Sequence, residues 1–142
     1  MGAKVVVIED DRALLRLLDS ILRSSDMEPV LFTNAEDALE WLPAERPEVV
    51  VCDLSLPGMR GVAFVEILRP TALAGTPLLL MSAYGEPKQH SADIFLGKPF
   101  DPVWLSELVE RMARAARRSD ASRLIGALAE LPLDLSSTAQ SR

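Results

Sequence analysis

Acids, a hydroxyl and a lysine follow short apolar segments of this chain. They are Glu9, Asp10, Asp53, Ser82 and Lys98. Carboxylates that are brought together repel one another, so such a site costs stability unless a cation neutralises it. Mg2+ suits it, since this ion binds one or two carboxylates plus waters and leaves positions open for phosphate oxygens. These residue types therefore predict phosphoryl chemistry assisted by Mg2+, with Asp10 and Asp53 supplying carboxylate ligands.

Asp53 is the candidate nucleophile. It ends the most apolar segment and precedes LSLPG, a turn-prone stretch that would present it to solvent. Transfer of a phosphoryl group to a carboxylate needs alignment and neutralisation of charge more than covalent help. Lys98 could neutralise one phosphoryl oxygen, and the Ser82 hydroxyl could donate a hydrogen bond to another. The product would be an acyl phosphate on Asp53.

The elements that position these residues follow from apolar patterning. Three segments without polar alternation predict strands that are covered on both faces, at residues 4–8, 49–52 and 78–81. Residues 30–33 fit a further strand, and residues 94–96 fit a short fifth strand. Apolar residues at helical spacing predict crossover helices at residues 14–22, 35–42, 62–68 and 101–112. Asn34 suits an N-cap, Asp101 and Pro102 suit a cap followed by the first helical residue, and Pro43 and Pro70 suit helix ends.

This alternation predicts an α/β fold, a doubly wound five-stranded parallel sheet with helices on both faces. In such sheets ligands bind beyond the carboxyl ends of the strands. The candidate residues all follow predicted strands, so they are expected to converge at that edge.

Four segments carry a family resemblance: VVVIEDDRALLRLL, VVVCDLSLPGMRG, LLLMSAYG and DIFLGKPF. In this order they resemble the receiver domains of bacterial two-component response regulators, which have a flavodoxin-like fold, and the resemblance covers residues 4 to 118. It implies that Asp53 is the phosphoacceptor and that Asp10 binds Mg2+ directly. It also implies that the Ser55 carbonyl completes the protein ligands and that Glu9 acts through a water molecule.

The same resemblance assigns conformational roles. Ser82 resembles the switch hydroxyl, and Phe95 resembles the aromatic residue that turns inward when the hydroxyl moves to the phosphoryl group. Lys98 resembles the family's phosphate-binding lysine, and its bond to Pro99 is expected to be cis.

One segment departs from the family pattern. Receivers carry a full helix between the switch hydroxyl and the fifth strand, but only residues 83–93 are available here and Pro87 interrupts them. We predict that this fourth helix is shortened or absent and that the output face is atypical.

Length and composition set the domain organisation. The 142 residues accommodate one core, so we expect a receiver domain at 1–118 and a C-terminal extension at 119–142, with a short amphipathic helix at 121–131 and a frayed end.

The net charge of -6 disfavours nucleic acid binding, and the local basic patch of Arg111, Arg114, Arg117 and Arg118 suits a solvated helix end. One cysteine allows no internal disulfide, and Cys52 suits a small buried side chain. No apolar run is long enough for a membrane helix, which predicts a cytoplasmic protein.

These features predict a stand-alone response regulator that takes its phosphoryl group from a histidine kinase or phosphotransfer protein. It would signal to a downstream protein target, and a homodimer stays open. It would not be an enzyme beyond self-catalysed phosphotransfer and autodephosphorylation. Two alternatives remain: a degenerate receiver that serves as a scaffold, and a Mg2+-dependent phosphohydrolase. The latter usually needs a second acid two residues after the nucleophile, where this chain has Ser55.

Overall fold

The computed structural model describes residues 2–42, 45–71 and 75–117. Its strands are β1 (Lys4–Ile8), β2 (Glu28–Phe32), β3 (Val49–Asp53), β4 (Leu78–Ser82) and β5 (Ile94–Gly97). Its helices are α1 (Arg12–Ser24), α2 (Ala35–Trp41), α3 (Gly61–Leu68) and α4 (Pro102–Arg117). All strand pairs are parallel, in the order β2-β1-β3-β4-β5. The predicted doubly wound sheet is confirmed.

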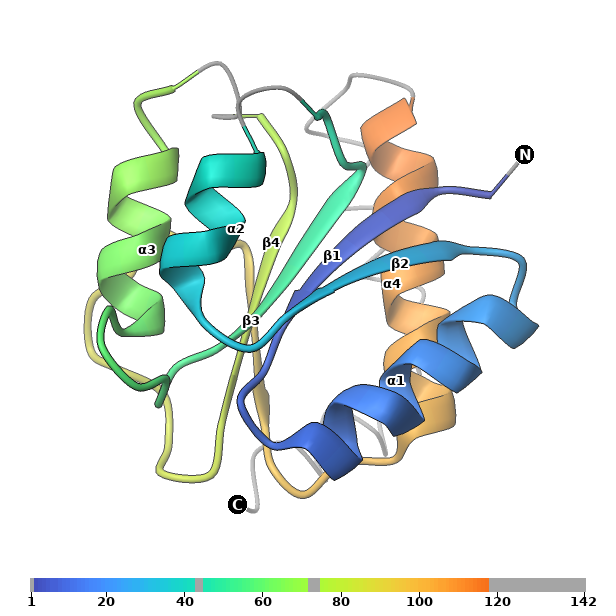
Figure 1. Cartoon of the computed structure of the whole chain (residues 1–142), viewed down its shortest axis with the longest axis horizontal. Coiled ribbons are helices and arrows are strands. Elements are labelled where there is room, and N and C mark those ends of the chain that lie inside the picture. Colours follow the sequence, from blue (N-terminus) through green and yellow to red (C-terminus); the bar gives the residue numbers. More distant parts are fainter. Residues whose placement is uncertain (1, 43–44, 72–74, 118–142) are drawn as a thin grey trace.

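Helices cover both faces of the sheet. α2 and α3 pack on one face, and α1 and α4 pack on the other (Figure 1). Successive strand residues alternate between the two layers: Val5 and Val7 join the α1/α4 core, whereas Val6 and Ile8 join the α2/α3 core. All four are fully buried, which explains why the strand sequence is apolar without alternation.

Strand β2 begins earlier than the sequence predicts. The prediction was 30–33, but the strand starts at Glu28, includes Pro29 and ends before Thr33. β2 is an edge strand that pairs with β1 alone. A proline is tolerated at an edge because one side of the strand needs no ladder hydrogen bonds.

Asp53 and Ser82, predicted to follow their strands, are the last residues of β3 and β4.

Polar caps set the helix starts. Asp11 accepts hydrogen bonds from the backbone N–H groups of Ala13 (3.0 Å) and Leu14 (3.2 Å) at the start of α1. Asn34 accepts from Asp37 N (2.8 Å) at α2. Asp101 accepts from Val103 N (3.0 Å), and Pro102 is the first residue of α4. The predicted caps at Asn34 and Asp101 are therefore confirmed.

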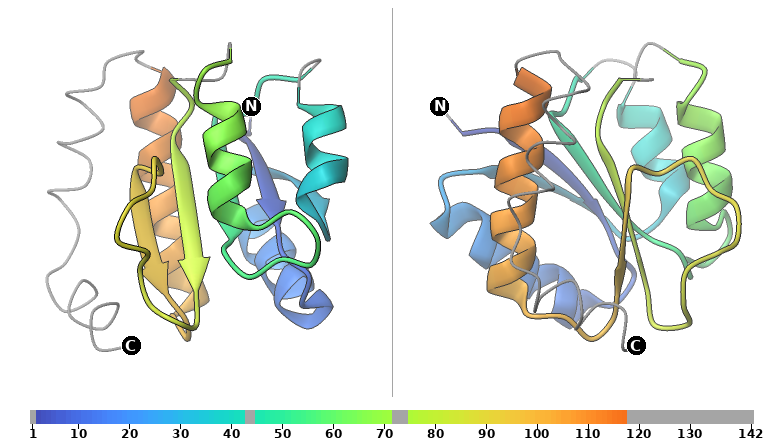
Figure 2. Two further views of the ribbon diagram at one scale, coloured as in Figure 1. Left: turned by 90° about the vertical axis from the view of Figure 1, so that its left-hand side faces the viewer. Right: turned by 180° about the vertical axis from the view of Figure 1, so that it is seen from behind.

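The β4–β5 loop (residues 83–93) contains no helix. It runs as an open connection beside α3 (Figure 2). The prediction of a shortened or absent helix is confirmed, and Arg69 holds the loop in its place. The Arg69 guanidinium donates to Ser91 O (2.8 Å), Thr76 O (3.1 Å) and the Asp93 carboxylate (2.8 Å). Asp93 in turn accepts from Leu78 N (2.8 Å), so one side-chain cluster ties the loop to β4 and α3.

We expect Arg69→Met to lower the free energy of unfolding by about 2–3 kcal/mol, because hydrogen bonds to a charged group are the stronger kind and Asp93 would lose its partner. Urea unfolding measures this loss. Arg23→Met is the matched control: its side chain is 60% exposed and pairs with Asp19 within one helix, so a loss of about 0.5 kcal/mol or less is expected. Equal losses in both variants would contradict the role of Arg69.

The predictions for Arg118 and for residues 119–142, including the helix at 121–131, lie outside the described residues. Within the parts of the chain that the structure describes, no helix has both the length and the apolar character that crossing a membrane requires.

Candidate functional site

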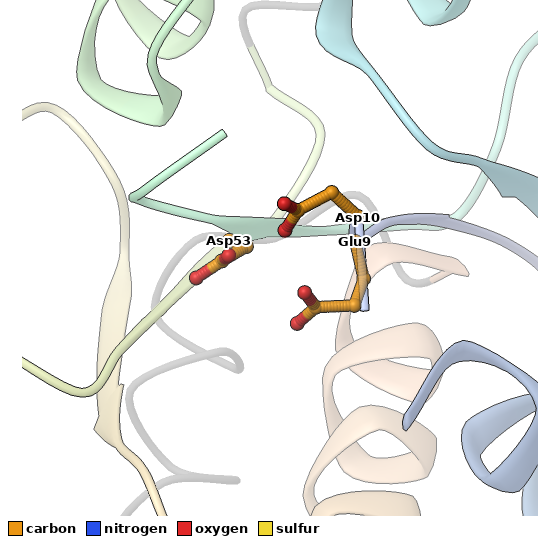
Figure 3. A group of neighbouring side chains, drawn as sticks. All are labelled: Glu9, Asp10 and Asp53. Atoms are coloured by element: carbon orange, nitrogen blue, oxygen red, sulfur yellow. The ribbon is translucent and has the colours of Figure 1, made fainter. Parts of the chain in front are cut away.

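Three carboxylates meet at the carboxyl edge of the sheet. Glu9 and Asp10 follow β1, and Asp53 ends the neighbouring strand β3. One carboxylate oxygen from each residue lies within 4.8 Å of the others. Figure 3 shows the carboxylates of Asp10 and Glu9 directed toward the side on which Asp53 lies. Glu9 and Asp53 are buried and Asp10 is exposed, so the cluster opens to solvent on the Asp10 side.

Lys98 supplies the positive charge of this edge. Its Nζ lies 2.6 Å from Glu9 Oε1 and 3.3 Å from Asp53 Oδ1. The backbone directs it: Lys98 N donates to Ser82 O (2.8 Å), and the bond from Lys98 to Pro99 is cis, as the resemblance implied. Burial by itself lowers the pKa of Lys98, but the hydrogen bond that Lys98 donates to Glu9 and the charges of Glu9 and Asp53 outweigh it and raise that pKa. Lys98 therefore stays charged.

Glu9 is held at both oxygens. Oε1 accepts from Lys98, and Oε2 accepts from Asp11 N at 3.0 Å. Burial nevertheless raises the pKa of Glu9, against the opposing effects of these two hydrogen bonds, and the nearby Asp53 charge raises it further. The ionised form of Glu9 is therefore less favourable at this site than in a solvent-exposed glutamate.

This raised pKa predicts a pH effect on stability without metal. A group whose pKa is higher in the folded protein stabilises the fold fully below its unfolded value, here 4.5, and this stability is lost as pH rises through the folded pKa. We expect the free energy of unfolding of the wild type, relative to Glu9→Gln, to fall as pH rises in the range above about 4.5, because the folded pKa of Glu9 is raised. Urea unfolding in EDTA across this range measures the difference. A difference that does not vary with pH would contradict the assignment.

The remaining candidates lie on neighbouring strand ends. Ser82 is buried, and its Oγ accepts from Tyr84 N at 2.9 Å. Ser55 is half-buried in the β3–α3 loop (residues 54–60). Phe95 is half-buried against the α2/α3 core, and its ring centroid lies 6.5 Å from that of His90. Ser82 ends β4, which pairs with β3, so it lies on the strand next to that of Asp53. Phe95 lies on the edge strand β5.

Gly61 is a site residue that the sequence reasoning did not single out. Its backbone N–H donates to Leu54 O at 3.0 Å, which closes the β3–α3 loop behind Asp53. A Cβ at this position would lie 2.6 Å from Asp53 O and 2.9 Å from Leu54 Cα. The available signal was a glycine just before an apolar helical run, which suggests a close approach of backbones.

We expect Gly61→Ala to lower the free energy of unfolding by about 1–3 kcal/mol, because the clash is with backbone atoms that cannot rotate away. It should also slow any reaction at Asp53, whose own carbonyl must shift. Gly75→Ala is the matched control, since a Cβ there meets nothing within 4 Å and its effect should be close to zero. Urea unfolding of both variants measures the effect, and similar stability of the two would refute the close-packing argument.

The donor set matches a hard cation. Carboxylate oxygens are the ligands that Mg2+ prefers, and three acids facing one ammonium group leave excess negative charge at the edge. Cys52, next to Asp53, adds no competing chemistry: burial raises the pKa of its thiol, with the charges of Asp53 and Glu9 acting in the same direction, so it stays protonated. The fold and this edge together define an α/β domain of the receiver class.

Comparisons with known proteins agree. Residues 5–110 match the model of the response regulator receiver domain. The chain is 39% identical over 119 residues to the response regulator protein FleR of Pseudomonas aeruginosa, covering 80% of this chain and 25% of FleR. It is 31% identical over 126 residues to the DNA-binding response regulator MtrA of Mycobacterium tuberculosis, covering 84% of this chain and 53% of MtrA.

Among solved structures, the chemotaxis response regulator CheY4 of Vibrio cholerae superposes with a TM-score of 0.73 at 26% identity, covering 79% of this chain and 99% of CheY4. The chain belongs to the response regulator receiver domain family. Receiver domains of this family are signalling phosphoacceptors of two-component systems. The chain spans between a quarter and about half of the length of the two curated relatives named above.

Proposed function

We propose that Asp53 accepts a phosphoryl group from a histidine kinase or phosphotransfer protein, that this transfer depends on Mg2+, and that the modified domain signals through a protein partner. The observation that supports this proposal is the convergence of three carboxylates within 4.8 Å, with the Lys98 ammonium group 3.3 Å from Asp53. We assign this function to a receiver domain at residues 1–118, with residues 119–142 as an extension.

The metal ligands in this proposal are Asp10, Asp53 and the Ser55 carbonyl, with Glu9 acting through water. All of these are oxygen donors, and the exposed side of the cluster at Asp10 leaves room for waters. When bound, Mg2+ neutralises the acids and shields one phosphoryl oxygen. Glu9 keeps its hydrogen bond to Asp11 N, so it stays oriented beside the ion.

The transfer step balances as a displacement at phosphorus. An Asp53 carboxylate oxygen attacks the phosphorus, the bond from phosphorus to the donor atom breaks, and its electron pair leaves with the donor. The product is an acyl phosphate. Lys98 faces a second phosphoryl oxygen, and the Ser82 hydroxyl donates a hydrogen bond to the third.

The signal would leave through the β4–β5 loop. Ser82 Oγ accepts from Tyr84 N, so movement of Ser82 toward the phosphoryl group breaks this bond and frees the start of the loop. Tyr84 is 84% exposed and would meet a partner directly. Phe95 would turn inward with Ser82. We propose a protein as the downstream target, with no DNA binding by this domain, and a homodimer as an alternative assembly.

Intact-protein mass after incubation with acetyl phosphate tests this function. We expect one phosphoryl adduct with Mg2+ and none in EDTA, and borohydride reduction followed by peptide mapping should locate it at Asp53. Asp10→Asn should weaken Mg2+ binding by about 10-fold or more and slow the reaction in proportion. An adduct that forms equally well in EDTA would contradict the metal dependence.

A scaffold that has lost the chemistry is the second candidate, which one observation permits: the β4–β5 loop lacks the helix that receivers use in their output face. This candidate predicts no adduct and no measurable Mg2+ binding by the wild type. Either signal would exclude it.

A further inference from the structure

Glu36, on helix α2, contacts the β3–α3 loop that follows Asp53. Its Oε2 accepts a hydrogen bond from Met59 N at 2.9 Å, although the two residues are 23 positions apart. A carboxylate that accepts from a backbone N–H forms a charge-assisted bond, which is stronger than a neutral one. The contact therefore joins the loop to a helix on the same face of the sheet.

The backbone of the loop is shaped to receive this carboxylate. Gly58 has φ +72°, a left-handed conformation that suits glycine. A Cβ at Gly58 would lie 2.6 Å from Glu36 Oε2, so the carboxylate rests directly against the glycine. Because Gly58 has no Cβ, the Glu36 carboxylate can lie directly against the backbone of the loop.

The helix holds Glu36 in place. Asn34 caps α2, and the neighbouring Ala35 and Ala38 are fully buried in the core. An acid in the first turn is also favoured by the helix dipole. The helix therefore holds the backbone of Glu36 in place, and the Glu36 side chain can order the β3–α3 loop.

Backbone hydrogen bonds hold the start of the β3–α3 loop at Leu54. Leu54 N donates to Met81 O (2.7 Å), and Gly61 N donates to Leu54 O (3.0 Å). These bonds hold Leu54 at the start of the loop, and the Glu36 contact holds Met59, close to the end of the loop. Ser55, whose carbonyl is a proposed Mg2+ ligand, lies between the fixed points at Leu54 and Met59.

We propose that Glu36 is a positioning residue for the metal site: it fixes the β3–α3 loop so that the Ser55 carbonyl is preorganised for Mg2+. This inference rests on the proposed function. Mg2+ demands near-ideal octahedral geometry at about 2.0–2.1 Å, so a small loss of order in the loop weakens binding. Glu36 itself touches the loop backbone and acts on the ion through Ser55.

Calorimetric titration with Mg2+ tests this role in Glu36→Ala and Glu36→Gln. We expect the alanine variant to bind Mg2+ about 10-fold more weakly, the lower end for residues that orient metal ligands, because the contact is exposed. The glutamine variant keeps an acceptor for Met59 N and should bind within about threefold of the wild type. At saturating Mg2+ the alanine variant should recover the wild-type rate of phosphoryl uptake.

Asp37→Ala is the matched control, because Asp37 is an acid in the same helical turn whose carboxylate bonds to Asn34. It should leave Mg2+ affinity unchanged. The inference is overturned if Glu36→Ala binds Mg2+ as the wild type does, if Asp37→Ala weakens binding equally, or if Glu36→Gln is as weak as the alanine variant. A wild type that binds no Mg2+ and takes no phosphoryl group would instead overturn the proposed function.

Discussion

Asp53→Asn is expected to gain no phosphoryl group under conditions in which the wild type gains one. The amide is nearly isosteric with the carboxylate but lacks the anionic oxygen that attacks phosphorus. Its carbonyl oxygen can still face Lys98, whose Nζ lies 3.3 Å from Asp53 Oδ1, so the fold should persist. Intact-protein mass and urea unfolding, measured on the same samples, separate loss of chemistry from loss of structure.

Asp11→Asn is the matched control for this variant. Asp11 lies at the same edge, but its carboxylate caps α1, and asparagine is an equally good cap. We expect Asp11→Asn to be phosphorylated at close to the wild-type rate. A phosphoryl adduct of wild-type yield on Asp53→Asn would place the acceptor at another residue.

Lys98→Met is expected to have the second-largest effect, on both activity and stability. Removing a preorganised positive charge that faces a developing anion costs about 100-fold or more in rate. The substitution also leaves Glu9 and Asp53 buried without their cation, and loss of one partner from a buried pair costs about 3–5 kcal/mol. The rate of phosphoryl uptake and the free energy of unfolding in EDTA measure the two effects.

Mg2+ should restore part of the stability of Lys98→Met, because the ion would neutralise the same carboxylates. Lys88→Met serves as the control, since Lys88 is an exposed lysine on the β4–β5 loop and its loss should change neither quantity. If Lys98→Met kept wild-type stability in EDTA, the contacts of Lys98 with Glu9 and Asp53 would not stabilise the metal-free site.

The β4–β5 loop contains no helix, whereas the family resemblance implies one there. With no helix in the β4–β5 loop, the Arg69 cluster holds the connection to α3, and the loop begins at the hydrogen bond between Tyr84 and Ser82. Under the proposed function, one end of the loop would respond to phosphorylation of Asp53 through Ser82, while the Arg69 contacts would hold the other end. A partner that reads this loop would recognise an extended backbone and an exposed tyrosine rather than a helix.

The sequence by itself determined the order of the elements and the edge at which the acids meet. Apolar runs without alternation predict strands buried on both faces, and parallel strands bring their carboxyl ends to one edge, where Glu9, Asp10 and Asp53 were expected. The pairing of β1 with β3 in the structure makes them neighbours. The short segment at 83–93 and its Pro87, compared with the full helix that the family resemblance implies, also predicted a shortened or absent helix.

Only the tertiary structure decided which side chains meet across these elements. The sequence reasoning assigned Lys98 to phosphate, but in the fold its shorter contact is with Glu9. Two hydrogen bonds between distant segments were not predicted: that of Arg69 with Asp93 and that of Met59 N with Glu36. The close packing of Gly61 on Asp53 and the start of β2 at Glu28 were not predicted either. The physical reason is that periodicity records the burial of each residue locally, whereas a contact between distant segments depends on their register and packing, which no local pattern encodes.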